Sequence, residues 1–176
     1  GNLDDISLRA IDVIKSADFI YTEDTRSFKK ILDSIECKKK CKSFHEHNED
    51  IICDEIIKYL KNKKHVILTC EAGTPAISDP GYKLIRECLN LNLKYTLIPG
   101  PSSLINAVVL SGLPTDKFSF YGFIPKKNNA QQKLFQKVSN DEKTAIMFEL
   151  SKDLEKQLFL FQNILIIIEI FQFAER

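Results

Sequence analysis

The sequence lacks the glycine-rich loops that usually hold nucleotide phosphates. It contains no Gly-x-Gly-x-x-Gly string and no phosphate-binding loop that ends in Gly-Lys-Ser or Gly-Lys-Thr. These absences argue against the usual dinucleotide and ATP sites, in which backbone N–H groups surround the phosphates. The chain also shows no internal repeat and no low-complexity tract. Any ligand site must therefore use another kind of loop.

Long apolar runs are missing too. The most apolar stretch, residues 158–170, contains Gln162, Asn163 and Glu169 and falls short of the ~20 apolar residues that a membrane span needs. The five cysteines are an odd number, and we expect no signal peptide. Reduced thiols in a cytoplasmic protein are the simplest interpretation.

One group of cysteines and histidines lies close together in the sequence. Its members are Cys37, Cys41, His45, His47 and Cys53. A zinc site is the alternative to weigh, but the group has no Cys-x-x-Cys knuckle. We therefore predict no metal site.

The charge of the chain is nearly balanced. Its 25 Lys and Arg residues face 24 Asp and Glu residues, for a net charge of +1, so global charge neither favours nor excludes nucleic acid. Locally, lysines cluster at three places: Lys38, Lys39, Lys40 and Lys42; Lys61, Lys63 and Lys64; and Lys126 with Lys127. Two readings stay open for these clusters, solvated loop tips and phosphate-contacting patches.

Apolar spacing alternates between helix-type and strand-type patterns along the chain. Helices are expected over residues 3–17, 27–35, 48–60, 80–91, 102–110, 128–138 and 152–161. Strands are expected over residues 18–22, 42–44, 65–69, 94–98, 118–123, 143–149 and 164–171. This alternation predicts an α/β fold with a parallel sheet and helices on its faces. A boundary between Pro114 and Pro125 would divide the chain into domains 1–115 and 116–176.

The most informative stretch, residues 69–81, follows the apolar run 65–68 and precedes a helical pattern. Asp79 is a suitable N-cap and Pro80 a suitable first helical residue. In open α/β sheets, ligands bind beyond the carboxyl ends of the strands. A stiff loop of small residues at that place suits a flat organic ligand held largely by backbone groups.

Three further polar strings follow expected strands. They are Glu23-Asp24-Thr25-Arg26, His45-Glu46-His47-Asn48 and Pro99-Gly100-Pro101-Ser102-Ser103. Each alone has a structural explanation, as a helix cap or a rigid turn. Four such loops at successive strand ends indicate one site at a shared sheet edge. Cys70 also ends a strand, but no local partner supports a nucleophilic role.

These strings occur in the order found in a known family. The matching segments are Gly1-Asn2-Leu3-Asp4-Asp5-Ile6-Ser7-Leu8-Arg9-Ala10, the strings at 23–26 and 45–48, the loop 72–81, the string at 99–103, and Ser111-Gly112-Leu113-Pro114-Thr115-Asp116. Over residues 1 to about 125 the chain closely resembles the ribosomal RNA small-subunit methyltransferase I group, within the tetrapyrrole methylase superfamily.

The resemblance implies a fold and a reaction. It implies two α/β domains, the first with a doubly wound, mostly parallel sheet, and S-adenosylmethionine between them. The first strand of domain 1–115 is expected to be missing, because the chain opens directly into a helix. Domain 116–176 is expected to be partial. The resemblance further implies a homodimer in the bacterial cytoplasm that methylates a cytidine ribose 2′-hydroxyl in 16S ribosomal RNA.

The resemblance also implies roles for individual residues. The cofactor side would be lined by Ala72, Gly73, Thr74, Pro75, Ile77, Ser78, Pro101, Ser102 and Ser103. The substrate side would carry Glu23, Arg26 and His45 as catalytic residues, with Asp24, Glu46 and Asn48 as binding residues. These residue types fit the reaction, because a ribose hydroxyl must be aligned with the methyl donor and must lose a proton. His45 or Glu23 could take that proton, and Arg26 could hold a phosphate.

The match has departures, and two other functions stay open. Cys70-Glu71 stands where the family often has Ser-Asp, and Glu149-Leu150-Ser151-Lys152 lacks the family's proline. One alternative is methylation of a tetrapyrrole ring, although the string at 45–48 and the lysine clusters favour RNA. The other is a non-catalytic RNA-binding or assembly module.

Overall fold

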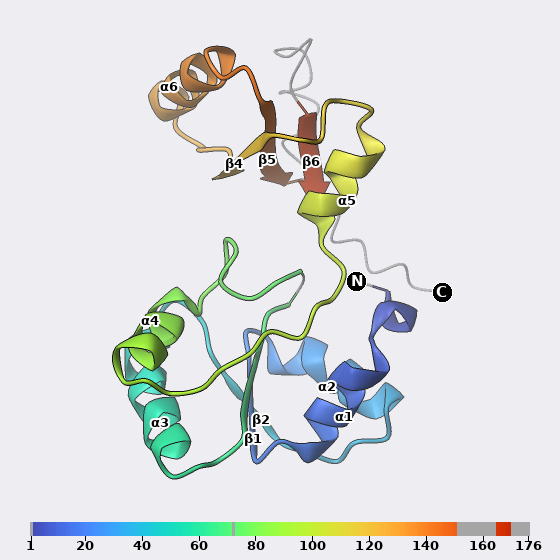
Figure 1. The fold of residues 1–176 in the computed structure, drawn as a ribbon, viewed down its shortest axis with the longest axis vertical. Coiled ribbons are helices and arrows are strands. Elements are labelled where there is room, and N and C mark those ends of the chain that lie inside the picture. The colour runs from blue at the N-terminus through green and yellow to red at the C-terminus, as the bar shows by residue number, and fades with distance from the viewer. Residues whose placement is uncertain (1, 72, 151–164, 170–176) are drawn as a thin grey trace. The chain divides into compact units, whose positions relative to one another are not determined.

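The protein has a parallel α/β fold, as the sequence predicted. The computed structural model describes residues 2–71, 73–150 and 165–169, with backbone only for residues 150 and 165–169. The chain divides into two compact units, Gly1–Pro101 and Ser102–Arg176. Each unit contains a parallel sheet of three strands, and Figure 1 shows how the elements of each unit are arranged.

The sheet of the first unit contains β1 (Phe19–Thr22), β2 (Cys41–Ser43) and β3 (Val66–Thr69) in the order β2-β1-β3. Ile20 of the central strand lies opposite Cys41 and Ile67. Since all three strands are parallel, their carboxyl ends meet at one edge. This edge is where the sequence predicted a site.

Helices cover both faces of this sheet. They are α1 (Leu8–Ser16), α2 (Thr25–Ser34), α3 (Glu49–Lys61) and α4 (Tyr82–Asn90). Successive side chains of a strand point to opposite faces, and Ile20 and Tyr21 accordingly belong to different cores. Ile20 packs with residues of α1 and α2, whereas Tyr21 packs with residues of α3 and α4. The first unit is therefore doubly wound, as expected.

The single helix expected over residues 3–17 is two elements. A short 3₁₀ helix η1 (Leu3–Asp5) is capped by Asn2, and α1 is capped by Ser7, whose Oγ accepts the Ala10 N–H at 3.2 Å. Ile6 between them is extended. Ser7 takes the extended backbone of an N-cap residue. A single helix therefore cannot run from Leu3 through to Ser16.

Two other expectations for the first unit are wrong. Residues 94–98 form no strand, and this segment pairs with none of the described strands. The apolar side chains of this segment are exposed, with Tyr95 53% and Leu97 59% accessible. An extended segment becomes a strand only when its backbone groups hydrogen-bond to a neighbouring strand. Helix α4 begins at Tyr82 with Gly81 as its N-cap, so Asp79 is not the cap.

The second unit contains α5 (Ser103–Leu110), β4 (Phe118–Phe123), α6 (Asn128–Ser139), β5 (Thr144–Leu150) and β6 (Leu165–Glu169), with strand order β4-β5-β6. Val108 of α5 packs against Ile146 and Phe148 of the central strand. The sequence assigned this helix to domain 1–115, whereas the division of the chain falls between Pro101 and Ser102 because α5 buries its apolar side on the second sheet. The helix expected over 152–161 lies outside the described residues.

None of the helices described here is long and apolar enough to cross a membrane.

Candidate functional site

The carboxyl edge of the first sheet gathers three of the four polar strings. Residues 23–26 follow β1, residues 45–48 follow β2, and the loop 70–81 follows β3. The Phe44 N–H donates to the Thr22 carbonyl at 2.8 Å, and the Ser27 hydroxyl lies 3.3 Å from Glu71 Oε1. These bonds join the three strand ends into one surface, which we call the carboxyl-edge site.

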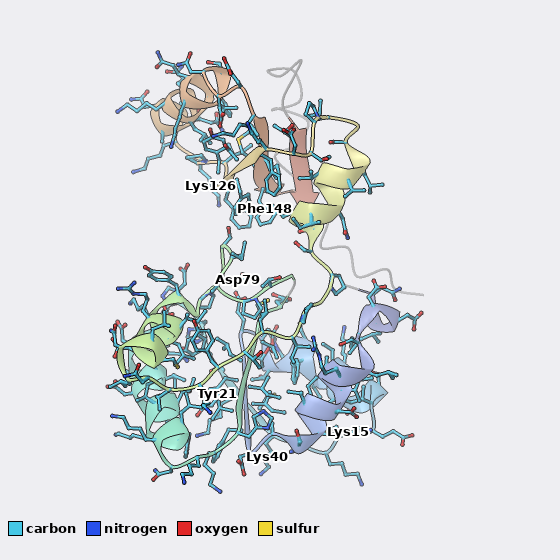
Figure 2. The ribbon with its side chains drawn as sticks, viewed as in Figure 1. Lys15, Tyr21, Lys40, Asp79, Lys126 and Phe148 are labelled. Atoms are coloured by element: carbon cyan, nitrogen blue, oxygen red, sulfur yellow. The ribbon has the colours of Figure 1, made fainter. Side chains whose placement is uncertain are left out.

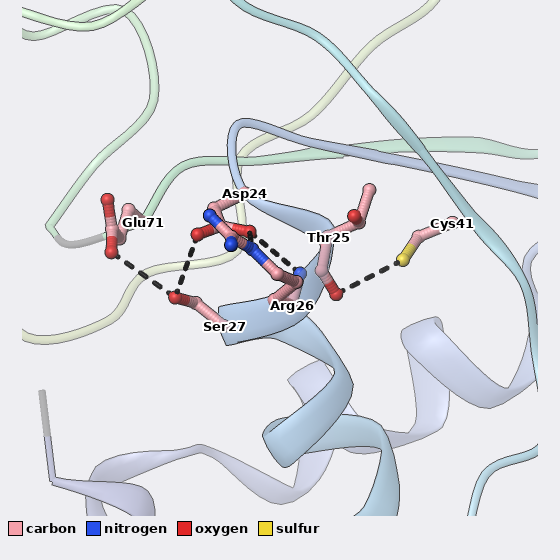
Figure 3. A network of polar contacts seen from close by, with 6 residues as sticks. All are labelled: Asp24, Thr25, Arg26, Ser27, Cys41 and Glu71. Atoms are coloured by element: carbon pink, nitrogen blue, oxygen red, sulfur yellow. Dashed lines mark hydrogen bonds and ion pairs between the residues drawn. The ribbon is translucent and has the colours of Figure 1, made fainter.

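Asp24 organises the string after β1 (Figure 3). Its Oδ1 accepts the Arg26 N–H at 2.8 Å as the N-cap of α2, and Arg26 Nε lies 3.4 Å from the same oxygen. The hydrogen bond from the Arg26 backbone, aided by the guanidinium charge, holds the pKa of Asp24 below its usual value. The side chain of Arg26 is 92% exposed. Asp24 thus has a capping role, whereas Arg26 is accessible to an anionic ligand.

Asp79 and Cys70 form a partly buried pair next to Glu23. Burial and then the Glu23 charge raise the pKa of Asp79 to about 6, against the opposing effect of a hydrogen bond with Cys70. Burial and then the Asp79 charge raise the pKa of Cys70 to about 12. The thiol is therefore protonated at neutral pH, which argues against Cys70 as a nucleophile. With a pKa of about 6, Asp79 is a perturbed titratable group of the kind that is frequent at functional sites.

Asn48 holds the string after β2. Its Oδ1 accepts the His45 N–H at 2.9 Å, and its Nδ2 donates to the Ser43 carbonyl at 3.1 Å. These bonds use the amide that the sequence assigned to substrate binding. His45 Nδ1 is buried and has no hydrogen-bond partner among the described residues, whereas Glu46 is exposed. A buried ring nitrogen without a hydrogen-bond partner is unusual in a folded protein, and a bound ligand or water is one way to satisfy it.

The loop after β3 has an unusual backbone. Gly73 has φ +76°, and the non-glycine residues Ala76 and Ser78 have φ +68° and +60°. Such conformations are strained for residues with a Cβ and cluster at ligand sites. A Cβ added at Gly73 would meet nothing within 4 Å, so the loop is open there. At the start of the loop, Thr69 Oγ1 is buried and lacks a partner within the described part of the chain.

The structure shows a residue that the sequence did not reveal. Glu49, the first residue of α3, is only 8% exposed, and its Oε1 accepts the Gly81 N–H at 2.9 Å. This bond ties the end of the loop after β3 to the helix that follows β2. Nothing in the local sequence signals the contact, because its partners lie 32 residues apart.

The remaining expected cofactor residues have mixed positions. Thr74 and Pro75 are half-buried and Ile77 and Ser78 are exposed, while Ala72 lies outside the described residues. Pro101 ends the first unit, and Ser102 and Ser103 begin the second, where Ser102 Oγ caps α5 by accepting the Ile105 N–H at 3.5 Å. The contribution of these last three residues to the carboxyl-edge site stays a prediction.

Over the described ranges, the structure brings together no group of three or more His, Cys, Asp or Glu side chains suited to a metal ion. In the Cys and His group considered above, Cys53 is buried in the core with Tyr21 and Ile56. The Cys41 thiol lies 3.9 Å from the Thr25 carbonyl. These two thiols serve packing and local structure.

Known proteins similar to this chain are methylases. The model of the family "Tetrapyrrole (Corrin/Porphyrin) Methylases" matches residues 1–164. A protein of Rickettsia prowazekii named ribosomal RNA small subunit methyltransferase I is 42% identical over 93% of this chain and 59% of its own length. The protein of that name from Thermotoga maritima is 39% identical over 85% of this chain and 67% of its own.

The fold also matches a solved structure. A crystal structure of diphthine synthase aligns with a TM-score of 0.65 and 19% identity, over 84% of this chain and 60% of that one. At this identity the likeness concerns the fold alone. The chain spans about half to two thirds of the length of the curated relatives it matches.

Proposed function

The chain belongs to the tetrapyrrole methylase family, and on this premise we propose that it acts in S-adenosylmethionine-dependent methylation of small-subunit ribosomal RNA. The observation that carries the proposal is identity of about 40% with proteins named for that activity, over 85–93% of this chain. The finer proposal is transfer to a cytidine ribose 2′-hydroxyl in 16S ribosomal RNA, by a cytoplasmic homodimer.

The carboxyl-edge site fits the methyl donor. S-adenosylmethionine supplies an electrophilic methyl group on a positively charged sulfur. The open, strained backbone of residues 73–78 offers N–H and C=O groups, and the buried Thr69 hydroxyl at its base needs a partner. Glu23, Glu71 and Asp79 give this edge the negative charge that favours a cationic ligand. Ala72, Pro101, Ser102 and Ser103 complete the proposed binding set.

The substrate side has groups suited to handling a proton and a phosphate. Within the described ranges His45 Nδ1 has no hydrogen-bond partner, and Glu23 lies close enough to Asp79 to raise its pKa. Either could accept the proton of a ribose hydroxyl in the transfer step. The exposed guanidinium of Arg26 suits a phosphate oxygen pair. Asp24 and Asn48 position Arg26 and His45, and Glu46 is exposed for contact with RNA.

Two measurements test the proposal. Calorimetry should show heat on mixing the chain with S-adenosylmethionine, and mixing without heat would favour a non-catalytic RNA-binding module. Transfer of labelled methyl groups to 30S subunits should exceed transfer to a tetrapyrrole acceptor. The reverse order would favour tetrapyrrole methylation, which the description of the family model makes the second candidate.

A further inference from the structure

The amino-terminal edge of the first sheet collects two lysine clusters that are separate in the sequence. Lys38, Lys39 and Lys40 precede β2, and Lys61, Lys63 and Lys64 end α3 or precede β3. Asp18 precedes β1 between them: it accepts the His65 N–H at 2.7 Å, and Lys64 Nζ lies 3.6 Å from its carboxylate. These six lysines, the amino-edge lysines, therefore occupy one edge of one unit.

This edge is hollowed. A pocket of about 310 Å³ is lined by Ala17, Asp18 and the first two residues of β1, together with Lys39, Lys40 and Lys42. Lys39 donates to the Ala17 carbonyl at the end of α1, and Lys42 pairs with Glu55. Four lysines of this edge are exposed and take no part in the two contacts just described: Lys38, Lys40, Lys61 and Lys63.

The two edges of the sheet carry opposite charge. The carboxyl-edge site has Glu23, Glu71 and Asp79, and apart from the phosphate that Arg26 is proposed to hold, these carboxylates disfavour phosphates. Figure 2 shows Asp79 and Lys40 at opposite ends of the first unit. A four-residue strand spans roughly 13 Å, more than the Debye length of about 10 Å at 0.1 M salt. The positive field of the amino-edge lysines is therefore not cancelled by the carboxyl edge.

We propose that the amino-edge lysines form a docking surface for RNA phosphates, distinct from the carboxyl-edge site. This inference rests on the proposed function, because it assigns the attraction for RNA to a surface away from methyl transfer. Lysine ammonium groups act as point charges without the planar fork of arginine, so the surface suits sequence-independent contact with a backbone. The carboxylates near these lysines include Glu36, Asp18 and Glu55. Asp18 is already engaged by Lys64 and His65, and Glu55 by Lys42.

The test measures how RNA binding depends on salt. A fluorescein-labelled single-stranded RNA of about 20 nucleotides is titrated with the chain at KCl concentrations from about 50 to about 300 mM. In this range phosphate contacts dominate the salt dependence of binding. In the double variant Lys40→Ala, Lys61→Ala, affinity at the lowest salt should fall on the order of tenfold. The slope of log K against log salt should shrink by about 1.4, or about 0.7 per lost contact to single strands. Lys63 is left unchanged because its φ of +58° makes substitution a backbone perturbation.

The control is Lys29→Ala, Lys133→Ala, which removes two exposed charges from α2 and α6. It should keep the wild-type slope. Wild-type affinity and slope in the Lys40, Lys61 variant, equal losses in both variants, or no RNA binding by the wild type would each overturn the inference. Calorimetry of every variant with S-adenosylmethionine separates the two proposals: a chain that binds RNA through these lysines but not the cofactor would contradict the proposed function alone.

Discussion

Glu49 Oε1 accepts a hydrogen bond from the backbone N–H of Gly81 at 2.9 Å, and both residues are buried. The bond joins the first turn of α3 to the N-cap of α4. Between Thr69 and Gly81 the chain passes through the strained loop of the carboxyl-edge site. The geometry of that loop thus depends on a carboxylate from a different strand–helix connection.

Replacing Glu49 by alanine should destabilise the first unit. The substitution leaves the buried Gly81 N–H without a partner, which costs about 1–3 kcal/mol. Glu49→Gln keeps an oxygen acceptor and should recover most of that loss. Urea unfolding followed by circular dichroism measures both. Asp50→Ala is the control, since Asp50 pairs with Lys83 at an exposed position and its removal should change little. Equal stability of Glu49→Ala and Asp50→Ala would contradict a structural role for the bond.

Gly81 should not tolerate a side chain. Its φ is +130°, and a Cβ would lie 3.0 Å from Leu68 Cδ2, so Gly81→Ala should lower the free energy of unfolding by about 1–3 kcal/mol. Gly100→Ala is the matched control because a Cβ there meets nothing within 4 Å. Denaturant midpoints compare the two variants. A Gly81→Ala protein as stable as the Gly100→Ala protein would show that the loop relaxes freely.

Asp79 should make stability depend on pH. Its folded pKa of about 6 lies above the ordinary value of 3.8, so the folded state binds the proton more tightly than the unfolded state. The proton on Asp79 therefore stabilises the folded state, by on the order of 1 kcal/mol after allowance for partial exposure. This stabilisation is complete below pH ~4 and is lost as the pH rises through ~6. Asp79→Asn should therefore gain stability relative to wild type between these pH values. A stability difference that is constant from pH 4 to 8 would refute this.

The substrate-side residues should separate catalysis from cofactor binding. Single variants Glu23→Gln and His45→Ala should each lower methyl transfer to 30S subunits, and the one that removes the general base should lower it about 10²–10⁴-fold. Arg26→Ala should mainly raise the RNA concentration needed, because its exposed guanidinium is proposed to contact the substrate. By calorimetry, affinity for S-adenosylmethionine should stay unchanged in His45→Ala and Arg26→Ala and should fall without being abolished in Glu23→Gln, which removes a charge that favours the cationic cofactor. Full activity in all three variants would remove these residues from the mechanism.

Local patterns in the sequence predicted most elements of the fold. The strand expected over 118–123 agrees with the structure, because apolar periodicity acts over a few residues. The strand expected over 94–98 is wrong although its residues alternate as in a strand, because a strand also needs a neighbouring strand to pair with. The packing of α5 shows a similar limit: its apolar side did not reveal which sheet would bury it.

By itself, the sequence determined the α/β alternation, the loops at strand ends and the family resemblance, all of which depend on residues close in the chain. Only the tertiary structure decided that Glu49 would hold Gly81, that Glu23 would raise the pKa of Asp79, and that two lysine clusters would share one edge. Parallel strand pairing brings these residues together across many positions, and no local propensity encodes which distant partners such pairing selects.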